Sequence, residues 1–172
     1  MAVDPNSSER ARRMRPGVRV GAVVSRFHGE LTGAMLESAR DELIASGMAA
    51  EDLRVVWVPG AFELAIVARR LAARADVDVV LCLGLVLKGE TTHDLHVAQG
   101  AVQGIVRASL DVDKPILFGV LTCATLAQAR DRALSVEHGG KEDKGREVAR
   151  AAVAVLAALD EVDETPARKS RS

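Results

Sequence analysis

The chain has 172 residues, a mass of 18.2 kDa and a formal net charge of -1. This length suits one ordinary domain, and 48% hydrophobic against 27% charged residues is enough apolar material for a core. The near-neutral charge argues against a dedicated nucleic-acid surface, and no apolar run reaches the roughly 18 residues of a membrane span.

The two ends of the chain are basic and resemble solvated tails. Residues 1–16 contain four arginines and lack the apolar stretch of a secretory signal. We therefore predict flexible tails at 1–16 and 161–172, a single domain at 17–160, and a cytoplasmic location. Cys82 and Cys123 both lie in apolar segments, which favours reduced packing residues over a disulfide.

The body of the chain alternates between β-branched apolar runs and stretches with helical spacing. In chain order, the pattern predicts strand 18–25, helix 31–46, strand 53–58, helix 62–73, strand 77–87, helix 92–110, strand 115–122, helix 126–133 and helix 144–159. The apolar runs are mostly continuous, which is typical of strands buried on both faces. Strands that alternate with helices predict an α/β fold with a parallel sheet covered on both faces.

Aromatic residues are scarce and fall near the expected ligand edge of the sheet. Parallel sheets bind ligands beyond the carboxyl ends of their strands, where the strand order reverses. Phe27 and Phe62 follow the first and second strands, and we place Phe118 toward the end of the fourth. This predicts a stacking surface for a planar ligand, because offset ring pairs add about 0.5–1.5 kcal/mol beyond burial. Ordinary loop packing is the alternative.

The segment after the third strand nearly matches a phosphate-binding loop. Residues 84–91 follow G-x-x-x-x-G-K-[ST] except at Glu90, where the pattern needs lysine, so we exclude nucleoside triphosphate binding. Gly89, Glu90, Thr91 and Thr92 still open a predicted helix, whose first N–H groups and positive dipole end favour an anion. Helix capping by threonine is the alternative, and the two roles are compatible.

His93 falls in the first turn of that helix, where a ring nitrogen can accept or donate a proton. A structural role is the alternative for a lone histidine. Glu90, His93 and His96 also form an i, i+3, i+6 set with possible zinc ligands. The rotation of successive positions around a helix argues against that metal site.

Two further charged residues are candidates for ligand contacts. Glu63, beside Phe62, can accept hydrogen bonds from a polyol, and the alternative is a carboxylate stabilised by a helix N-terminus. Arg132, in the predicted helix 126–133, can pair bidentately with a phosphate, and the alternative is a solvated face.

Several short motifs in this order and spacing resemble one known family. They are Ser25-Arg26-Phe27, Pro59-Gly60-Ala61-Phe62-Glu63, Leu83-Gly84, Gly89-Glu90-Thr91-Thr92-His93, Phe118-Gly119-Val120-Leu121-Thr122, Asp131-Arg132-Ala133 and Glu142-Asp143-Lys144-Gly145. Together they cover about residues 17–160 and resemble the lumazine synthase (6,7-dimethyl-8-ribityllumazine synthase) family.

The resemblance implies a fold and a reaction. The fold would be a three-layer sandwich with a four-stranded parallel sheet in flavodoxin-like order. The reaction, a step of riboflavin biosynthesis, would condense 5-amino-6-(D-ribitylamino)uracil with 3,4-dihydroxy-2-butanone 4-phosphate, releasing phosphate and water. It would need neither a metal nor an organic cofactor. The resemblance further implies a homo-oligomer and an association with riboflavin synthase.

The resemblance also assigns roles by position. Phe27 would stack on the uracil ring, and Glu63 would hold the ribityl hydroxyls. The other residues implied around the aminouracil are Ala61, Phe62, the backbone of Leu85, Val86 and Leu87, and Phe118 from a neighbouring subunit of a pentamer. His93 would transfer protons. The residues implied for the phosphate are Glu90, Thr91 and Arg132.

Two departures from the family pattern bear on function. Asp94-Leu95-His96 stands where the family usually has an aromatic, an acid and an aromatic. This motivates one alternative to the enzyme, a non-catalytic lumazine- or flavin-binding relative. A shell-forming protein is a third hypothesis. The stretch 134–143 is longer than the short turns of members that build sixty-subunit shells, which favours a pentamer or decamer.

Overall fold

The computed structural model describes residues 13–164. Its strands are β1 (Val20–Ser25), β2 (Leu53–Val58), β3 (Val79–Leu87) and β4 (Ile116–Cys123). Its α-helices are α2 (Gly29–Ala45), α3 (Leu64–Ala72), α4 (His93–Val112), α5 (Leu126–Ala133) and α6 (Lys144–Glu164). Three short 3₁₀ turns complete the chain: η1 (Ala50–Asp52), η2 (Ala61–Glu63) and η3 (Val136–His138).

The four strands form one parallel sheet in the order β2-β1-β3-β4. The predicted α/β fold with flavodoxin-like strand order is thereby confirmed. The chain moves from β1 outward to β2 and then crosses back to β3, so the order reverses between β1 and β3. Ligands of open parallel sheets bind beyond the carboxyl ends of the strands at such a point.

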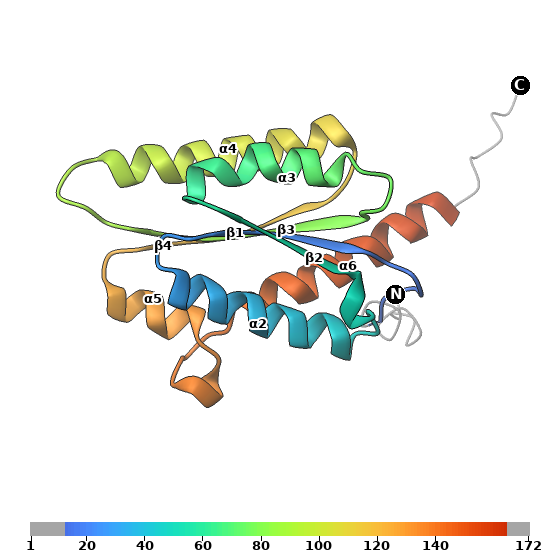
Figure 1. Cartoon of the computed structure of the whole chain (residues 1–172), viewed down its shortest axis with the longest axis horizontal. Helices are drawn as coiled ribbons and strands as arrows, with labels where there is room; N and C mark the ends of the chain where they lie inside the picture. The colour runs from blue at the N-terminus through green and yellow to red at the C-terminus, as the bar shows by residue number, and fades with distance from the viewer. Residues whose placement is uncertain (1–12, 165–172) are drawn as a thin grey trace, which may run out of the picture.

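Helices cover both faces of the sheet (Figure 1). α3 and α4 lie on one face, and α2, α5 and α6 lie on the other. Two apolar clusters fill these interfaces, one on each side of the sheet. Successive residues of β3 point into the two clusters in turn. Val80 and Cys82 join the cluster under α3 and α4, while Leu81 and Leu83 join the cluster on the other face. This alternation explains why β3 has a continuous apolar sequence.

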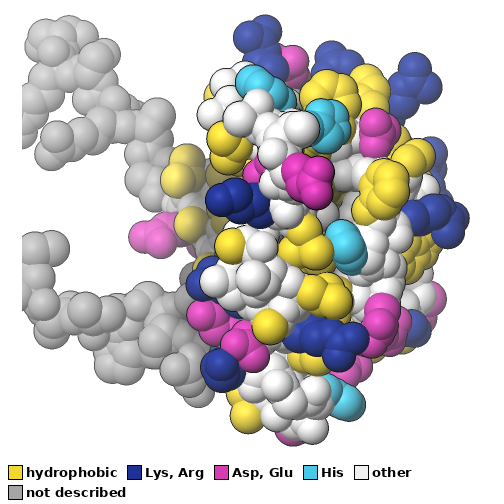
Figure 2. Space-filling model, turned by 90° about the vertical axis from the view of Figure 1, so that its left-hand side faces the viewer, with side chains coloured by type: hydrophobic (Ala, Val, Ile, Leu, Met, Phe, Trp, Pro, Cys, Tyr) yellow, Lys and Arg dark blue, Asp and Glu magenta, His cyan; other side chains and the backbone are white. Residues whose placement is uncertain are grey.

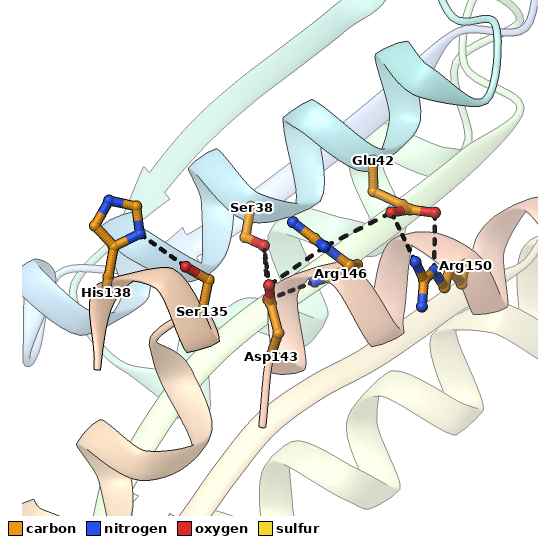
Figure 3. Close-up of polar contacts among 7 residues, drawn as sticks. All are labelled: Ser38, Glu42, Ser135, His138, Asp143, Arg146 and Arg150. Carbon is orange, nitrogen blue, oxygen red and sulfur yellow. Dashed lines mark hydrogen bonds and ion pairs between the residues drawn. The ribbon is translucent and has the colours of Figure 1, made fainter. Parts of the chain in front are cut away.

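A polar cluster joins α2 to the start of α6 (Figure 3). The Ser38 hydroxyl lies 2.6 and 2.7 Å from the two carboxylate oxygens of Asp143 and donates to that carboxylate. Asp143 also accepts the backbone N–H of Arg146 at 3.0 Å, so it caps the first turn of α6. On the next turns, the Glu42 carboxylate pairs with Arg150 at 2.8 Å. These contacts fix the segment before α6 against α2.

The boundaries of several elements differ from the predictions. α3 begins at Leu64 rather than 62, because the Glu63 carboxylate accepts the Gly60 N–H and holds a 3₁₀ turn first. α6 continues to Glu164, five residues past the predicted end at 159 and into the predicted C-terminal tail. Met14, in the predicted N-terminal tail, is buried, and its N–H donates to the carbonyl of Ser46. Residues 1–12 and 165–172 of the predicted tails lie outside the described range.

The predicted position of Phe118 near the end of its strand is wrong. Phe118 is the third of eight residues in β4 and pairs in register with Cys82 in the middle of β3. β4 is an edge strand, so no further strand lies beside Phe118, and 41% of this residue is exposed.

Within residues 13–164, none of the helices combines the length and hydropathy needed to cross a bilayer.

Candidate active site

A cavity of about 610 Å³ opens at the carboxyl ends of the strands. Its walls come from the loops after β1 and β2, the last residues of β3, and the first turns of α4. Figure 2 faces this end of the molecule and shows histidine and apolar side chains interspersed on it. The cavity therefore occupies the place where the strand order predicts a ligand.

The loops after β1 and β2 are joined by backbone hydrogen bonds. The Arg26 N–H donates to the Val58 carbonyl at 2.8 Å, and the Phe27 N–H donates to the Pro59 carbonyl at 3.1 Å. The Arg26 guanidinium also lies over the Trp57 ring, 5.7 Å from its centroid. The ladder between β1 and β2 thus continues past the strand ends and holds Phe27 beside the second loop.

Gly60 brings an aromatic ring and a carboxylate together. Its N–H donates to Oε2 of Glu63 at 2.9 Å. A Cβ on Gly60 would lie 3.1 Å from the Phe27 ring and 3.2 Å from the same Glu63 oxygen, so both groups pack around a position that has no side chain. The Phe27 ring is 68% exposed and Phe62 is 62% exposed, which leaves ring faces open to a ligand.

The end of β3 presents a partly unpaired backbone edge to the cavity. Among the described residues, β1 pairs with β3 only as far as Leu83, whereas β4 pairs with β3 through Leu87. Leu85, Val86 and Leu87 line the cavity on the side where β1 has already ended. Backbone N–H and C=O groups at such an edge can pair with the polar rim of a flat heterocycle.

The start of α4 forms another wall of the cavity. Gly89, Thr91 and His93 line the cavity here, and His93 is the first residue of α4. The side chain of Thr92 makes no capping hydrogen bond, while the Thr91 hydroxyl accepts the His93 N–H at 3.4 Å. The positive end of the α4 dipole and an imidazole therefore meet in one corner of the cavity.

Most of the predicted site residues meet in this cavity. Those that line it are Phe27, Ala61, Phe62, Glu63, Leu85, Val86, Leu87, Thr91 and His93. Three predicted residues are not part of its wall: Glu90, Phe118 and Arg132. Arg132 is exposed on α5 but close enough to Cys123, at the carboxyl end of β4, to oppose the rise in the pKa of that thiol. It therefore lies at the same edge of the sheet as the cavity.

Sequence reasoning did not assign several lining residues to the site. They are His28, Gly60, Asp94, His96 and Val97, whereas Gly89 was placed at the predicted anion site. His96 and Val97 stand three and four positions after His93 on α4, a helical spacing that puts them on the same face and could have indicated them. His28 follows Phe27 directly.

No group of three or more histidine, cysteine or acidic side chains within residues 13–164 is arranged to hold a metal ion.

The two cysteines do not provide a nucleophile. Burial raises the pKa of Cys82 to about 12 and also raises that of Cys123. A thiol with a raised pKa stays protonated at neutral pH and is a poor nucleophile. The chemistry of the cavity must come from other groups.

The chain matches one family model, and named relatives support the match. The model, described as 6,7-dimethyl-8-ribityllumazine synthase, matches residues 17–160. This chain belongs to the lumazine synthase family. A 6,7-dimethyl-8-ribityllumazine synthase of Protochlamydia amoebophila is 38% identical over 84% of this chain and 81% of its own length. Lumazine synthases from two strains of Thermus thermophilus are each 42% identical over 85% of this chain and 90% of their own length.

Among solved structures, an ABC domain in complex with L-Trp from Streptococcus pneumonia aligns with a TM-score of 0.42 and 19% identity. The alignment covers 87% of this chain and 45% of that one. Such a likeness supports no conclusion about function.

Membership of the lumazine synthase family settles the class of this protein. It is an enzyme of riboflavin biosynthesis that works without a cofactor, and its function is that of 6,7-dimethyl-8-ribityllumazine synthase. The family also implies small-molecule substrates and homo-oligomerisation.

Proposed function

We propose that the cavity at the carboxyl ends of β1, β2 and β3 is where the two substrates condense. The observation that supports this most is the edge of β3 from Leu85 to Leu87, which does not pair with β1 and lines the same cavity as Phe27 and His93. These features supply a stacking face, a polar backbone rim and a proton-transfer group around one space. A volume of about 610 Å³ is within the range of small-molecule sites.

The 5-amino-6-(D-ribitylamino)uracil binds against the loops after β1 and β2. Its ring stacks on Phe27, with Ala61 and Phe62 beside it, and its edge pairs with the backbone of 85–87. Glu63 holds the ribityl hydroxyls. Oε2 of this carboxylate already accepts the Gly60 N–H, which fixes its orientation and leaves the other oxygen for a hydroxyl donor.

The 3,4-dihydroxy-2-butanone 4-phosphate binds with its phosphate at the start of α4. Thr91 and the first N–H groups of the helix meet the anion, with Glu90 and Arg132 completing its surroundings. The substrate amine attacks the ketone to form an imine and water. Phosphate is then eliminated, and the ribityl-bearing nitrogen attacks the remaining carbonyl and closes the ring with loss of a second water. His93 transfers the protons. The amine is itself a nucleophile, so these steps require positioning more than activation.

The assembly is a pentamer, or a decamer of two pentamers, in which Phe118 of one subunit closes the cavity of its neighbour. Phe118 lies outside its own cavity and is exposed on edge strand β4. α4 carries four further exposed apolar side chains: Leu95, Val102, Val106 and Leu110. Apolar surface of this kind is typical of an interface between subunits.

The proposal is tested by mixing the purified oligomer with both substrates and following the absorbance of the lumazine product. The proposal predicts steady turnover that requires both substrates, from a particle with the sedimentation mass of five or ten chains. Binding of the aminouracil without product would favour a non-catalytic relative, and a sixty-chain particle would contradict the proposed assembly.

A further inference from the structure

We propose that His96 is a second catalytic residue, which transfers the protons of the final ring closure, while His93 serves the earlier steps beside the phosphate. This inference rests on the proposed function of the cavity. His96 lines that cavity together with His93. The family usually has an aromatic residue at this position, so the second imidazole is a feature of this chain.

His96 stands on the face of α4 that turns to the cavity. The lining residues of this helix are His93, Asp94, His96 and Val97. His93 and His96 are three positions apart, which makes them neighbours on one face with an offset of about 4.5 Å along the helix axis. Side chains of a helix lean toward its N-terminus, so the His96 imidazole leans toward the turn that carries His93.

The ring of Phe62 shows which end of the cavity His96 faces. This ring packs directly on α4 at Gly100, where a Cβ would lie 2.8 Å from its Cε2 atom and 3.1 Å from its Cδ2 atom. Gly100 stands one turn after His96 on the same face of the helix. Along α4, His96 therefore lies between the position of the Phe62 ring and His93.

This order along α4 matches the proposed order of the substrates. The phosphate binds at the start of α4, next to His93. The aminouracil binds beside Phe62, and its ribityl chain extends to the adjacent Glu63. The nitrogen that carries the ribityl chain thus lies on the Phe62 side of the cavity, which is the side of His96.

The imidazole of His96 is open to a ligand. Within residues 13–164, its side chain takes part in no hydrogen bond and no ion pair. The imidazole of His138, which lies outside the cavity, is instead tied to the Ser135 hydroxyl at 2.7 Å. An imidazole with both ring nitrogens open can accept a proton at one and donate a proton at the other.

Ring closure moves two protons from nitrogen to oxygen. The ribityl-bearing nitrogen attacks the carbonyl carbon, a C–N bond forms, and the electron pair of the C=O double bond moves to the oxygen. His96 takes the proton from the attacking nitrogen and delivers one to that oxygen. The C–O bond then breaks with its electron pair on oxygen, and the nitrogen lone pair forms a C=N bond. The neighbouring N–H of the pyrimidine ring gives its proton, through His96, to the leaving hydroxyl, which departs as water.

The imidazole returns to its starting state, and the step consumes no oxidant or reductant. A proton-transfer group must lie within about 2.6–3.2 Å of the atom that it serves. Elimination takes place beside the phosphate, and ring closure takes place at the ribityl-bearing nitrogen. Two imidazoles one turn apart on α4 therefore serve the two steps better than either alone.

The test follows phosphate release and lumazine absorbance in the same single-turnover reaction, with the assembled enzyme in excess over the aminouracil. His96→Ala removes the imidazole and keeps a good helix former on an exposed position of α4. His96→Gln keeps a polar side chain that cannot transfer protons. His138→Ala is the matched control, because it removes an imidazole outside the cavity. Sedimentation checks that each variant assembles as the unsubstituted enzyme does.

We expect His96→Ala to slow lumazine formation by about 10²-fold, the contribution of one proton-transfer group, and to leave the rate of phosphate release within about threefold. Phosphate should then appear well before lumazine. Added imidazole should restore part of the lumazine rate in His96→Ala, where the space of the ring is free, and less in His96→Gln. His93→Ala should delay both signals together, and His138→Ala should delay neither.

Lumazine formation at the unsubstituted rate in His96→Ala would overturn the inference, as would an equal delay of phosphate and lumazine. A loss in His96→Ala that His96→Gln repairs in full would also overturn it, since glutamine cannot transfer protons. Absence of both signals in the unsubstituted enzyme is a different result, which would contradict the proposed function of the cavity and this inference with it.

Discussion

The backbone N–H of Phe27 donates a hydrogen bond of 3.1 Å to the carbonyl oxygen of Pro59. Phe27 follows β1 and Pro59 follows β2, so this bond joins the two loops that carry the aromatic ring and the carboxylate of the cavity. Backbone geometry rather than side-chain packing therefore sets the distance between them. A ligand that stacks on Phe27 meets Glu63 at a fixed place.

The first prediction concerns the imidazole at the start of α4. Replacing His93 by alanine should lower kcat by about 10²-fold or less, because a proton-transfer group contributes about 10²–10⁴-fold and water can replace part of it. Steady-state kinetics with both substrates measure the effect. His138→Ala is the control, since that ring forms a hydrogen bond with Ser135, the residue before η3, and lies outside the cavity. Full activity of the His93 variant would remove this residue from the mechanism.

The second prediction concerns the phosphate. Arg132→Ala should raise the KM for the butanone phosphate by about tenfold or more, the effect of losing a charge-assisted hydrogen bond, and should leave the KM for the aminouracil unchanged. Arg130→Ala is a matched control on the same helix, because Arg130 pairs with Glu30 at the surface. Equal kinetic effects of the two substitutions would show that Arg132 has no specific role.

The third prediction concerns the polar cluster between α2 and α6. Asp143→Ala removes the acceptor of the Ser38 hydroxyl and the cap of the Arg146 N–H. It should lower the free energy of unfolding by about 2 kcal/mol, and urea titration at one protomer concentration measures this. Glu147→Ala, which removes an exposed pair with Lys144, should change it by less than about 0.5 kcal/mol. Similar losses in both variants would contradict the role of Asp143.

The fourth prediction concerns thiol reactivity. Burial raises the pKa of Cys82 to about 12 and raises that of Cys123, so both thiols remain protonated at pH 8. A thiol reagent should therefore label neither cysteine in the native oligomer and both after unfolding, as mass spectrometry of timed samples would show. Rapid labelling of Cys82 without unfolding would mean that β3 is far more accessible than its burial indicates.

The sequence predicted the sheet well because most of its strand residues are apolar and stretches with helical spacing separate the strands. β2 and α5 begin and end where the pattern places them. The pattern of apolar residues failed where a hydrogen bond between a side chain and the backbone decides the structure. Glu63 turns back to the Gly60 N–H and delays the start of α3, and nothing in the spacing of apolar residues encodes that bond.

The candidate site was predicted in part for the same reason. Residues that directly follow strands, such as Phe27, were placed at the correct edge by the topology of the sheet. Phe118 was misplaced because a continuous apolar run does not show where along the strand a ring falls relative to the cavity. His28 was missed because its place on the cavity wall depends on how β1 turns into α2, and the pattern of apolar residues does not encode that turn.

The most direct test of the account is a structure of the oligomer with an aminouracil analogue whose 5-amino group is replaced by a nitro group, so that it cannot form the imine. The account predicts the heterocycle flat on Phe27, its polar edge on the backbone of 85–87, and Phe118 of a neighbouring subunit against it. Analogue bound at another surface, with this cavity empty at saturating concentration, would contradict the account.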